Sequence, residues 1–187
     1  MCKLSRGNPS KPFSCEDDPA LHDSATLAAT LAMLGVQHLR TATAVEPVSI
    51  PQPTLVGALA RHQDPRVREA LIPLFLRHPT YAEHVPQLAA TLPRTASMTL
   101  RHMYTAAVYL QRLWRGTIGI YLGDFAMLPE YFGQQEFGLP HPNEHFGELG
   151  LRVLADLFRQ KTGYNWLSTY ESVISLFLTQ LRLERYR

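Results

Sequence analysis

The chain has 187 residues, of which 45% are hydrophobic, and its 18 lysines and arginines against 16 acidic residues give a formal net charge of +2. This length fits one domain with a buried core, and a charged fraction of only 18% excludes a disordered polyampholyte. The near-neutral charge excludes a strongly basic nucleic-acid binder, although a local basic patch remains open.

The first residues differ in composition from the rest of the chain. Residues 1–24 contain prolines, mixed charges and few large apolar side chains, which predicts a disordered tail ahead of a single helical domain over 25–187. Both cysteines, Cys2 and Cys15, lie in this tail, so a disulfide framework is not expected. Acidic residues precede the apolar stretch 25–36 where a secretory signal needs positive charge, and no apolar run reaches the roughly 20 residues that span a bilayer. We therefore expect a cytoplasmic protein.

Apolar residues recur at three- and four-residue steps along most of the chain, which predicts helices, and no segment alternates with the period of a strand. The fold class expected is all-α, as an irregular multi-helix bundle. In chain order the sequence predicts a helix over 25–39, an extended connector over 41–53, a helix over 54–62, one that begins at Pro65, one between Pro79 and Pro93, one over 97–115, one from Asn143 to Gly163, and one that begins near Ser168.

Several helix boundaries carry local signals. Asp64 is a good N-cap before a proline at the first helical position, and Pro73 should bend the helix that follows. Asn143 is expected to cap the next-to-last helix and Gly163 to end it, while Ser168 begins a capping-box pattern. The apolar stripes expected in the core are Leu100, Met103, Tyr104, Ala107, Leu110 and Trp114, then Phe146, Leu149, Val153 and Leu157, and finally Val173, Ile174, Phe177 and Leu181.

One long stretch, 116–142, fits no helix well because glycines and prolines interrupt it. It is also rich in aromatic residues, which disordered loops lack, so we expect an ordered aromatic and glycine-rich connection with short helical turns over 121–127 and 129–132. A connection of this length is either a packed crossover or a binding loop, and both remain open.

The segment 55–75 (LVGALARHQDPRVREALIPLF) resembles a helical repeat of the HEAT type. The resemblance implies a helical hairpin whose turn is held by the Asp, with small and branched residues between the helices. No second copy follows at the required period, so a single hairpin is expected rather than a solenoid.

The string His141-Pro142-Asn143-Glu144-His145 matches the H-x-x-E-H pattern of zinc peptidases. That chemistry needs both histidines on one helical turn, which Pro142 disfavours for His141. A looser metal site formed by His141, Glu144, His145 and Glu148 would suit a metal-dependent hydrolase or nuclease. The competing interpretation, which we favour, is that the histidines are surface residues and the glutamates lie near the positive end of a helix. No other catalytic motif and no cofactor motif occurs, so a non-enzymatic protein without a cofactor is favoured.

The helix predicted over 97–115 carries Arg101, Tyr109 and Arg112 on one stripe, with Arg115 beside it. Arginine and tyrosine concentrate binding energy in protein interfaces, and the same pair can bind phosphate and stack on bases. A solvated face opposite the core stripe explains the same residues without any ligand. The partner-binding residues expected from this stripe and from the aromatic connection are Arg101, Tyr109, Arg112, Arg115, Tyr121, Phe125, Tyr131 and Phe132.

Four segments together resemble a group of small bacterial all-helical proteins, mostly uncharacterised, some of which are partners of nucleotidyltransferase-type toxins. The segments are DPRVREALIPLFLRHP (64–79), YTAAVYLQRLW (104–114), FGLPHPNEHFGELGLRVLA (137–155) and YNWLSTYESVISLFL (164–178). The resemblance implies a protein-binding or regulatory role, with an enzyme such as a nucleotidyltransferase as the partner that is restrained. A metal-dependent hydrolase and a nucleic-acid binder are the alternatives.

Overall fold

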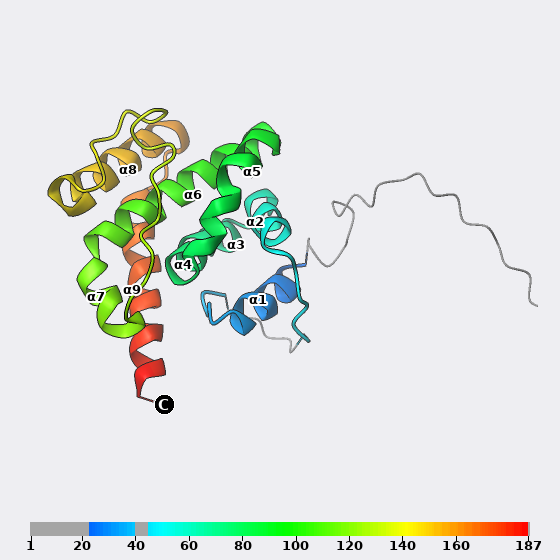
Figure 1. The fold of residues 1–187 in the computed structure, drawn as a ribbon. Coiled ribbons are helices and arrows are strands. Elements are labelled where there is room, and N and C mark those ends of the chain that lie inside the picture. Colours follow the sequence, from blue (N-terminus) through cyan, green and yellow to red (C-terminus); the bar gives the residue numbers. More distant parts are fainter. Residues whose placement is uncertain (1–22, 40–44, 187) are drawn as a thin grey trace, which may run out of the picture.

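The computed structural model describes residues 23–39 and 45–186, and every regular element in these ranges is a helix, as the sequence predicts (Figure 1). The predicted tail as far as residue 22 and part of the predicted connector lie outside the described residues, whereas Asp23 and Ser24, which the sequence placed in the tail, are the cap and the first residue of a helix. The helices are α1 (Ser24–Met33), α2 (Gln52–Arg61), α3 (Pro65–Glu69), α4 (Leu71–Arg77), the 3-10 helix η3 (Pro79–His84), α5 (Val85–Thr91), α6 (Arg94–Leu113), α7 (Arg115–Leu122), the 3-10 helix η4 (Glu144–Gly147), α8 (Glu148–Thr162) and α9 (Trp166–Arg185).

The first helix is shorter than predicted. The carboxylate of Asp23 caps its N-terminus, because it accepts hydrogen bonds from the Thr26 backbone N–H at 2.9 Å and from the Thr26 hydroxyl at 2.6 Å. The helix ends at Met33, and the predicted end at residue 39 is wrong. Gly35 takes a positive φ of 74°, a conformation that leaves the helix and that glycine adopts without strain.

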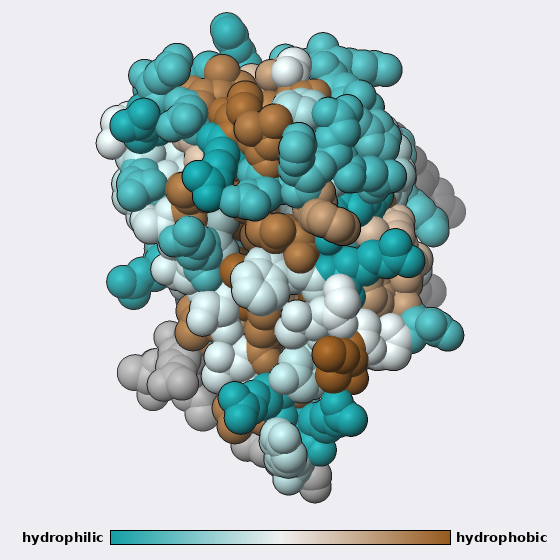
Figure 2. All heavy atoms as spheres, turned by 90° about the vertical axis from the view of Figure 1, so that its left-hand side faces the viewer, coloured by the Kyte–Doolittle hydropathy of each residue, from teal (hydrophilic) through white to brown (hydrophobic). Residues whose placement is uncertain are grey.

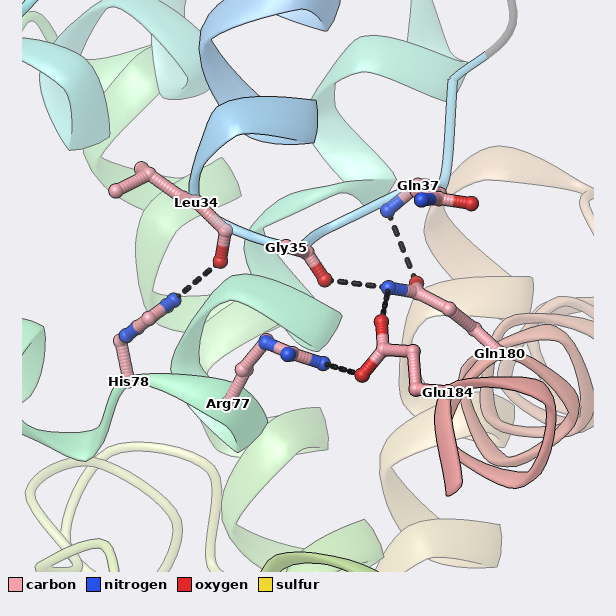
Figure 3. A network of polar contacts seen from close by, with 7 residues as sticks. All are labelled: Leu34, Gly35, Gln37, Arg77, His78, Gln180 and Glu184. Atoms are coloured by element: carbon pink, nitrogen blue, oxygen red, sulfur yellow. Dashed lines mark hydrogen bonds and ion pairs between the residues drawn. The ribbon is translucent and has the colours of Figure 1, made fainter. Parts of the chain in front are cut away.

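Polar side chains of α4 and α9 hold the turn that follows α1 (Figure 3). The Gln180 amide of α9 donates to the Gly35 carbonyl and accepts from the Gln37 backbone N–H at 2.9 Å. The Arg77 guanidinium of α4 donates to Glu184 at 2.9 Å, and the other oxygen of that carboxylate accepts from Gln180 at 2.6 Å. This network joins the beginning, the middle and the end of the chain.

The signal at Asp64 acts as predicted, and the effect of Pro73 is larger than the predicted bend. Asp64 accepts a hydrogen bond from the Arg66 backbone N–H at 2.9 Å and caps α3. Pro73 has no N–H for the carbonyl of Glu69, and the helix divides into α3 and α4 just after that residue. The segment 55–75 thus consists of α2, α3 and part of α4, and its HEAT-like character stays a prediction.

Helix α6 packs against α2, α4, α5, α7, α8 and α9 and runs through the middle of the bundle (Figure 1). Its predicted core stripe is buried as far as Leu110, but Trp114 beyond its end is 36% exposed. The opposite face is not solvated, since Thr105 and Tyr109 are also buried. That face is covered by residues 123–143, which we refer to as the crossover segment.

The connection predicted over 116–142 begins as a helix, so this part of the prediction is wrong. Helix α7 continues to Leu122, and Ile118 in its middle is fully buried. Packing of this helix against α6 and α9 outweighs the weak helix propensity of its glycines. The helical turns predicted over 121–127 and 129–132 are absent, because the crossover segment contains turns and extended residues but no helix.

Helix α8 begins later than predicted. The Asn143 side chain does not cap it and instead accepts a hydrogen bond from the Arg112 Nε at 3.1 Å. The helix starts after Gly147, whose φ is 85°, and it ends as predicted at Gly163, whose φ is 71°.

The core stripe predicted for α8 is wrong at three of its four residues. Phe146, Leu149 and Val153 are all exposed, and Phe146 is exposed to 76%, whereas Leu157 is half-buried and packs against the core. Helix α8 turns a different face toward α6 and α9. The residues that it buries are Gly150, Leu151, Leu154, Ala155 and Phe158.

Helix α9 begins ahead of its predicted cap. Asn165 is the N-cap and accepts from the Ser168 backbone N–H at 3.5 Å, so the capping box predicted at Ser168 is wrong. The predicted core stripe of α9 is confirmed, since Val173, Ile174, Phe177 and Leu181 are all buried.

The ring of Tyr109 fills the space between α6, α8 and the crossover segment. It is fully buried, and its hydroxyl donates to the Pro140 carbonyl at 2.5 Å. A Cβ atom on Gly150 would lie 2.0 Å from this ring, one on Gly133 would lie 2.9 Å from the hydroxyl oxygen, and one on Gly147 would lie 2.8 Å from the Tyr109 carbonyl oxygen. Any side chain at these three positions would force Tyr109 to move.

A second buried cluster surrounds His102 of α6. Its ring stacks on Phe158 with 3.6 Å between centroids, and its Nε2 lies 2.5 Å from the Tyr170 hydroxyl. Burial, with a smaller effect of the Lys161 charge, lowers the pKa of His102 to about 3. The imidazole is therefore neutral and joins α6 to α8 and α9.

Replacing Gly150 by alanine should destabilise the protein by about 1–3 kcal/mol, because the Tyr109 ring has no free space into which it can move. This is the opposite of the usual effect in a helix, where alanine is favoured over glycine by about 0.5–1 kcal/mol. Gly119→Ala in α7 is the matched control, since its Cβ would meet only Phe125, at 3.7 Å, and should stabilise. Urea unfolding of both variants checks the signs, and a shared sign would contradict this account.

The low pKa of His102 predicts a loss of stability in acid. In the unfolded state His102 binds a proton near its ordinary pKa of 6.5, whereas in the folded state it does so only near 3. The stability that the neutral imidazole contributes to folding is therefore fully present above pH 6.5 and is lost as the pH falls toward 3. The free energy of unfolding should decrease through this group by at most about 1.4 kcal/mol per pH unit.

Urea unfolding between pH 7 and pH 4 measures this slope. His102→Gln should reduce it, whereas Tyr170→Phe, which keeps the buried imidazole, should retain it at a lower overall stability. Equal slopes in wild type and His102→Gln would contradict the assignment.

Candidate functional site

Polar residues of α6 bind the crossover segment, and one of them, Gln111, was not part of the face predicted from the sequence. Gln111 is fully buried, and its amide donates to the Ala126 carbonyl at 3.0 Å while it accepts from the Leu128 backbone N–H at 2.7 Å. An irregular segment has no regular backbone partners, so the side chains of a neighbouring helix supply them.

The two arginines of this face are also engaged within the chain. Arg101 forms an ion pair with Glu136 and donates to the Ala89 carbonyl at 3.2 Å. Arg112 donates to the Leu128 carbonyl at 3.0 Å. The residues that suggested phosphate binding thus hold the crossover segment in place.

The predicted aromatic partners on this side face inward as well. Tyr131 stacks on Tyr104 with 5.4 Å between centroids, and Phe132 is buried beneath the Arg101 guanidinium, 5.0 Å from its ring centre. Burial raises the pKa of Tyr104 and of Tyr109 well above 10, so both phenols stay protonated. This half of the 116–142 stretch is a packed crossover.

The remaining predicted partner-binding residues lie around α7. Arg115 is exposed, and with Phe125 and Asp124 it lines a small pocket of about 330 Å³. Tyr121 lines a different and larger groove.

The structure does not assemble the predicted metal site. In the ranges 23–39 and 45–186 no three His, Cys, Asp or Glu side chains are arranged to hold a metal ion, and this includes His141, Glu144, His145 and Glu148. Glu148 instead pairs with Arg152, one turn later in α8, at 2.7 Å. His145 has a left-handed backbone with a φ of 46°, so no regular helical turn carries the two histidines.

A groove of about 600 Å³ opens between α9 on one side and α7 and α8 on the other, with the end of α6 between them. Figure 2 shows this face of the molecule, where apolar surface forms a broken vertical line bordered by hydrophilic side chains. The residues lining the groove are Leu110, Leu113, Trp114, Thr117, Tyr121, Glu148, Leu151, Arg152, Leu167, Glu171, Ile174, Ser175, Leu178, Thr179 and Arg182.

Most of the groove surface is apolar or carries only a hydroxyl group. Leu113 and Leu178 are half-buried, so part of each side chain faces the groove, and the Trp114 ring stands beside them. Leucine and tryptophan in an open groove expose apolar surface that a monomer usually buries.

Charged groups lie at the edges of this groove. The ion pair between Glu148 and Arg152 belongs to α8 and is exposed. Glu171 and Arg182 both belong to α9, both are exposed, and neither has a hydrogen-bond or ion-pair partner among the described residues.

The turn before α8 is strained. His145, Phe146 and Gly147 have φ values of 46°, 56° and 85°, and the left-handed conformation costs about 1–2 kcal/mol for a residue with a side chain. Phe146 gains no burial in return, since its ring is largely exposed. Gly147 at the end of this turn lies so close to the backbone of Tyr109 that a Cβ atom there would be 2.8 Å from the Tyr109 carbonyl oxygen.

The groove was not predicted from the sequence. The sequence placed Trp114 in the core because it follows Leu110 by four residues, the spacing of one helix face. Helix α6 ends at Leu113, however, and Trp114 lies at the surface. The signal that could have revealed the groove is a second stripe on α9, where Glu171, Ser175, Leu178 and Arg182 follow at steps of four, three and four residues.

No family model, no curated protein and no solved structure matches the chain. Within the described ranges, none of the helices combines the length and apolar character that a bilayer span requires.

Phe146→Gly should stabilise the protein by about 1 kcal/mol, because glycine adopts the left-handed conformation freely and the exposed ring contributes no packing. Phe146→Ala is the matched control, since alanine also removes the ring but keeps the unfavourable φ, and it should give little or no gain. Thermal unfolding of both variants checks this. If Phe146→Gly were no more stable than Phe146→Ala, the backbone strain assigned to this position would be wrong.

Proposed function

We propose that this chain is a non-enzymatic, cytoplasmic protein-binding protein, and that its groove between α7, α8 and α9 receives a helix of a protein partner. The open apolar groove is the observation that carries the proposal. Grooves of this kind, long and lined by leucine, accept the apolar face of an amphipathic helix.

The residue types around the groove support protein binding. Tryptophan and arginine concentrate energy at interfaces, and Trp114, Arg152 and Arg182 all line it. The hydroxyl groups of Thr117, Ser175 and Thr179 interrupt the apolar walls and offer hydrogen bonds that fix a partner in one position. The Arg101 and Tyr109 face is occupied internally, so the groove is the stronger candidate for a partner site.

We further propose that the partner is an enzyme that this chain restrains, such as a nucleotidyltransferase. The support is the resemblance of four segments to helical proteins that accompany nucleotidyltransferase-type toxins. The measurement is the activity of the captured partner with and without added chain, and an unchanged activity would reject restraint while leaving binding intact.

Filling the groove should abolish partner binding. Ser175 is exposed and lines the groove, so Ser175→Trp places a large ring in the space that a partner helix would occupy. Ser172→Trp is the matched control, because Ser172 is an exposed serine of the same helix that does not line the groove.

The measurement is gentle purification of each form from its host at native level, followed by identification of the proteins that accompany it. We expect a partner with wild type and with Ser172→Trp that is lost with Ser175→Trp. Recovery of wild type as a lone monomer, or the same partner with both variants, would contradict the proposal.

A further inference from the structure

The groove carries opposite charges at its two ends. Glu171 and Arg182 lie on the same helix, and the difference between their numbers, 182 − 171, is 11 residues. At about 1.5 Å per residue they are about 16 Å apart along α9, and eleven residues are close to three whole turns, so both side chains lie on one line.

Among the described residues, no side chain pairs with either of these two charges. Arg152 is paired with Glu148 across one turn of α8, which leaves Glu171 and Arg182 as the unpaired carboxylate and the unpaired guanidinium among the described residues that line the groove. The groove is therefore negative at the end near the start of α9 and positive at the end near its C-terminus.

The surface between these charges suits a helix. Six α9 residues from Glu171 to Arg182 line the groove, and four of them, Glu171, Ser175, Leu178 and Arg182, follow at steps of four, three and four residues, which is the spacing of a helix-packing seam. Ser175 in the middle is small and lets another backbone come close, while Leu178 and Trp114 offer apolar contact.

The charges also decide the direction of the occupant. A helix that runs antiparallel to α9 has its first turn beside Arg182 and its last turn beside Glu171. An acidic residue in the first turn and a basic residue in the last turn then meet the opposite charge of the groove. The same placement is favourable within the occupant itself, because it complements the helix dipole.

We propose that the groove binds, antiparallel to α9, an amphipathic helix of a partner protein with an acidic residue in its first turn and a basic residue eleven positions later. This inference rests on the proposed function and adds the chemistry and orientation of the partner. A second copy of this chain is a weaker occupant. Its own α9 has the same charge spacing. However, the apolar face of that helix is already packed on α6 and α8, and Gln180 and Glu184 bind its end to the turn after α1 and to α4, so this face is not available to another groove.

Two synthetic amphipathic peptides of identical composition test the orientation. One carries glutamate in its first turn and lysine eleven positions later, and in the other the two charges are exchanged. Binding of the fluorescently labelled peptides to the full chain is measured by anisotropy. We expect the first peptide to bind about tenfold more tightly at low salt, since two exposed attractive pairs replace two repulsive ones, and the preference should disappear at about 1 M salt while apolar binding persists.

Exchanging the charges of the protein separates recognition from peptide helicity. The double variant Glu171→Lys with Arg182→Glu should invert the preference for the two peptides. The matched control exchanges Asp156 and Arg159, an exposed ion pair of α8 outside the groove, and should leave the preference unchanged.

The outcomes distinguish the two proposals. Equal affinity of the two peptides, a preference that the double variant does not change, or binding of neither peptide would overturn the charge-directed orientation. If the two peptides bind with equal affinity and Ser175→Trp abolishes their binding, the groove remains the proposed docking site. If Ser175→Trp does not affect their binding, the peptides bind elsewhere, and both the docking groove and the charge-directed orientation are contradicted. A stable dimer of the chain alone, with its affinity reduced by either single charge reversal, would make a second copy the occupant and overturn the heterologous partner.

Discussion

The fold depends on the space that three glycines leave around Tyr109. The ring lies where α6, α8 and the crossover segment meet, and Gly133, Gly147 and Gly150 each approach it or its backbone too closely for a Cβ atom. Because protein interiors are close-packed and accommodate an extra methyl group poorly, these contacts define how far α8 and the crossover segment stand from α6. The strained turn through His145 and Phe146 leads directly into Gly147, which lies against the Tyr109 carbonyl.

Once the crossover segment is held against α6, the two sides of the bundle differ in character. On the covered side, buried side chains such as Gln111 form hydrogen bonds with the backbone of the irregular crossover segment. Arg101 and Arg112 bind backbone carbonyls within the chain. On the other side α7 and α8 stand apart around α9, and no element of the described chain fills the space between them. The groove lies on this second side, and Glu171 and Arg182, the two charged residues of α9 without a partner among the described residues, both line it.

Sequence reasoning succeeded where a residue acts on its own backbone. Asp64 caps α3 with its short side chain, Pro73 divides a helix because it has no N–H, and Gly163 ends α8 with its positive φ. Each of these effects acts within a few residues of the chain. Sequence reasoning failed where two local signals compete or where burial decides. Asn143 is a good cap by type, but its amide is bound by Arg112 and the helix begins at Glu148 instead.

The sequence alone determined that the described chain is all-helical and that the apolar stripe of α9 faces the core, because the period of the apolar residues reflects the geometry of a single helix. Only the tertiary structure decided which faces are open. Arg101, Tyr109 and Arg112 have the composition of a binding surface, yet the crossover segment covers them. Trp114 has the spacing of a core residue, and Glu171 and Arg182 belong to an exposed stripe of α9, yet all three line the groove. The physical reason is that exposure depends on contacts between residues far apart in sequence, which the pattern of one helix does not contain.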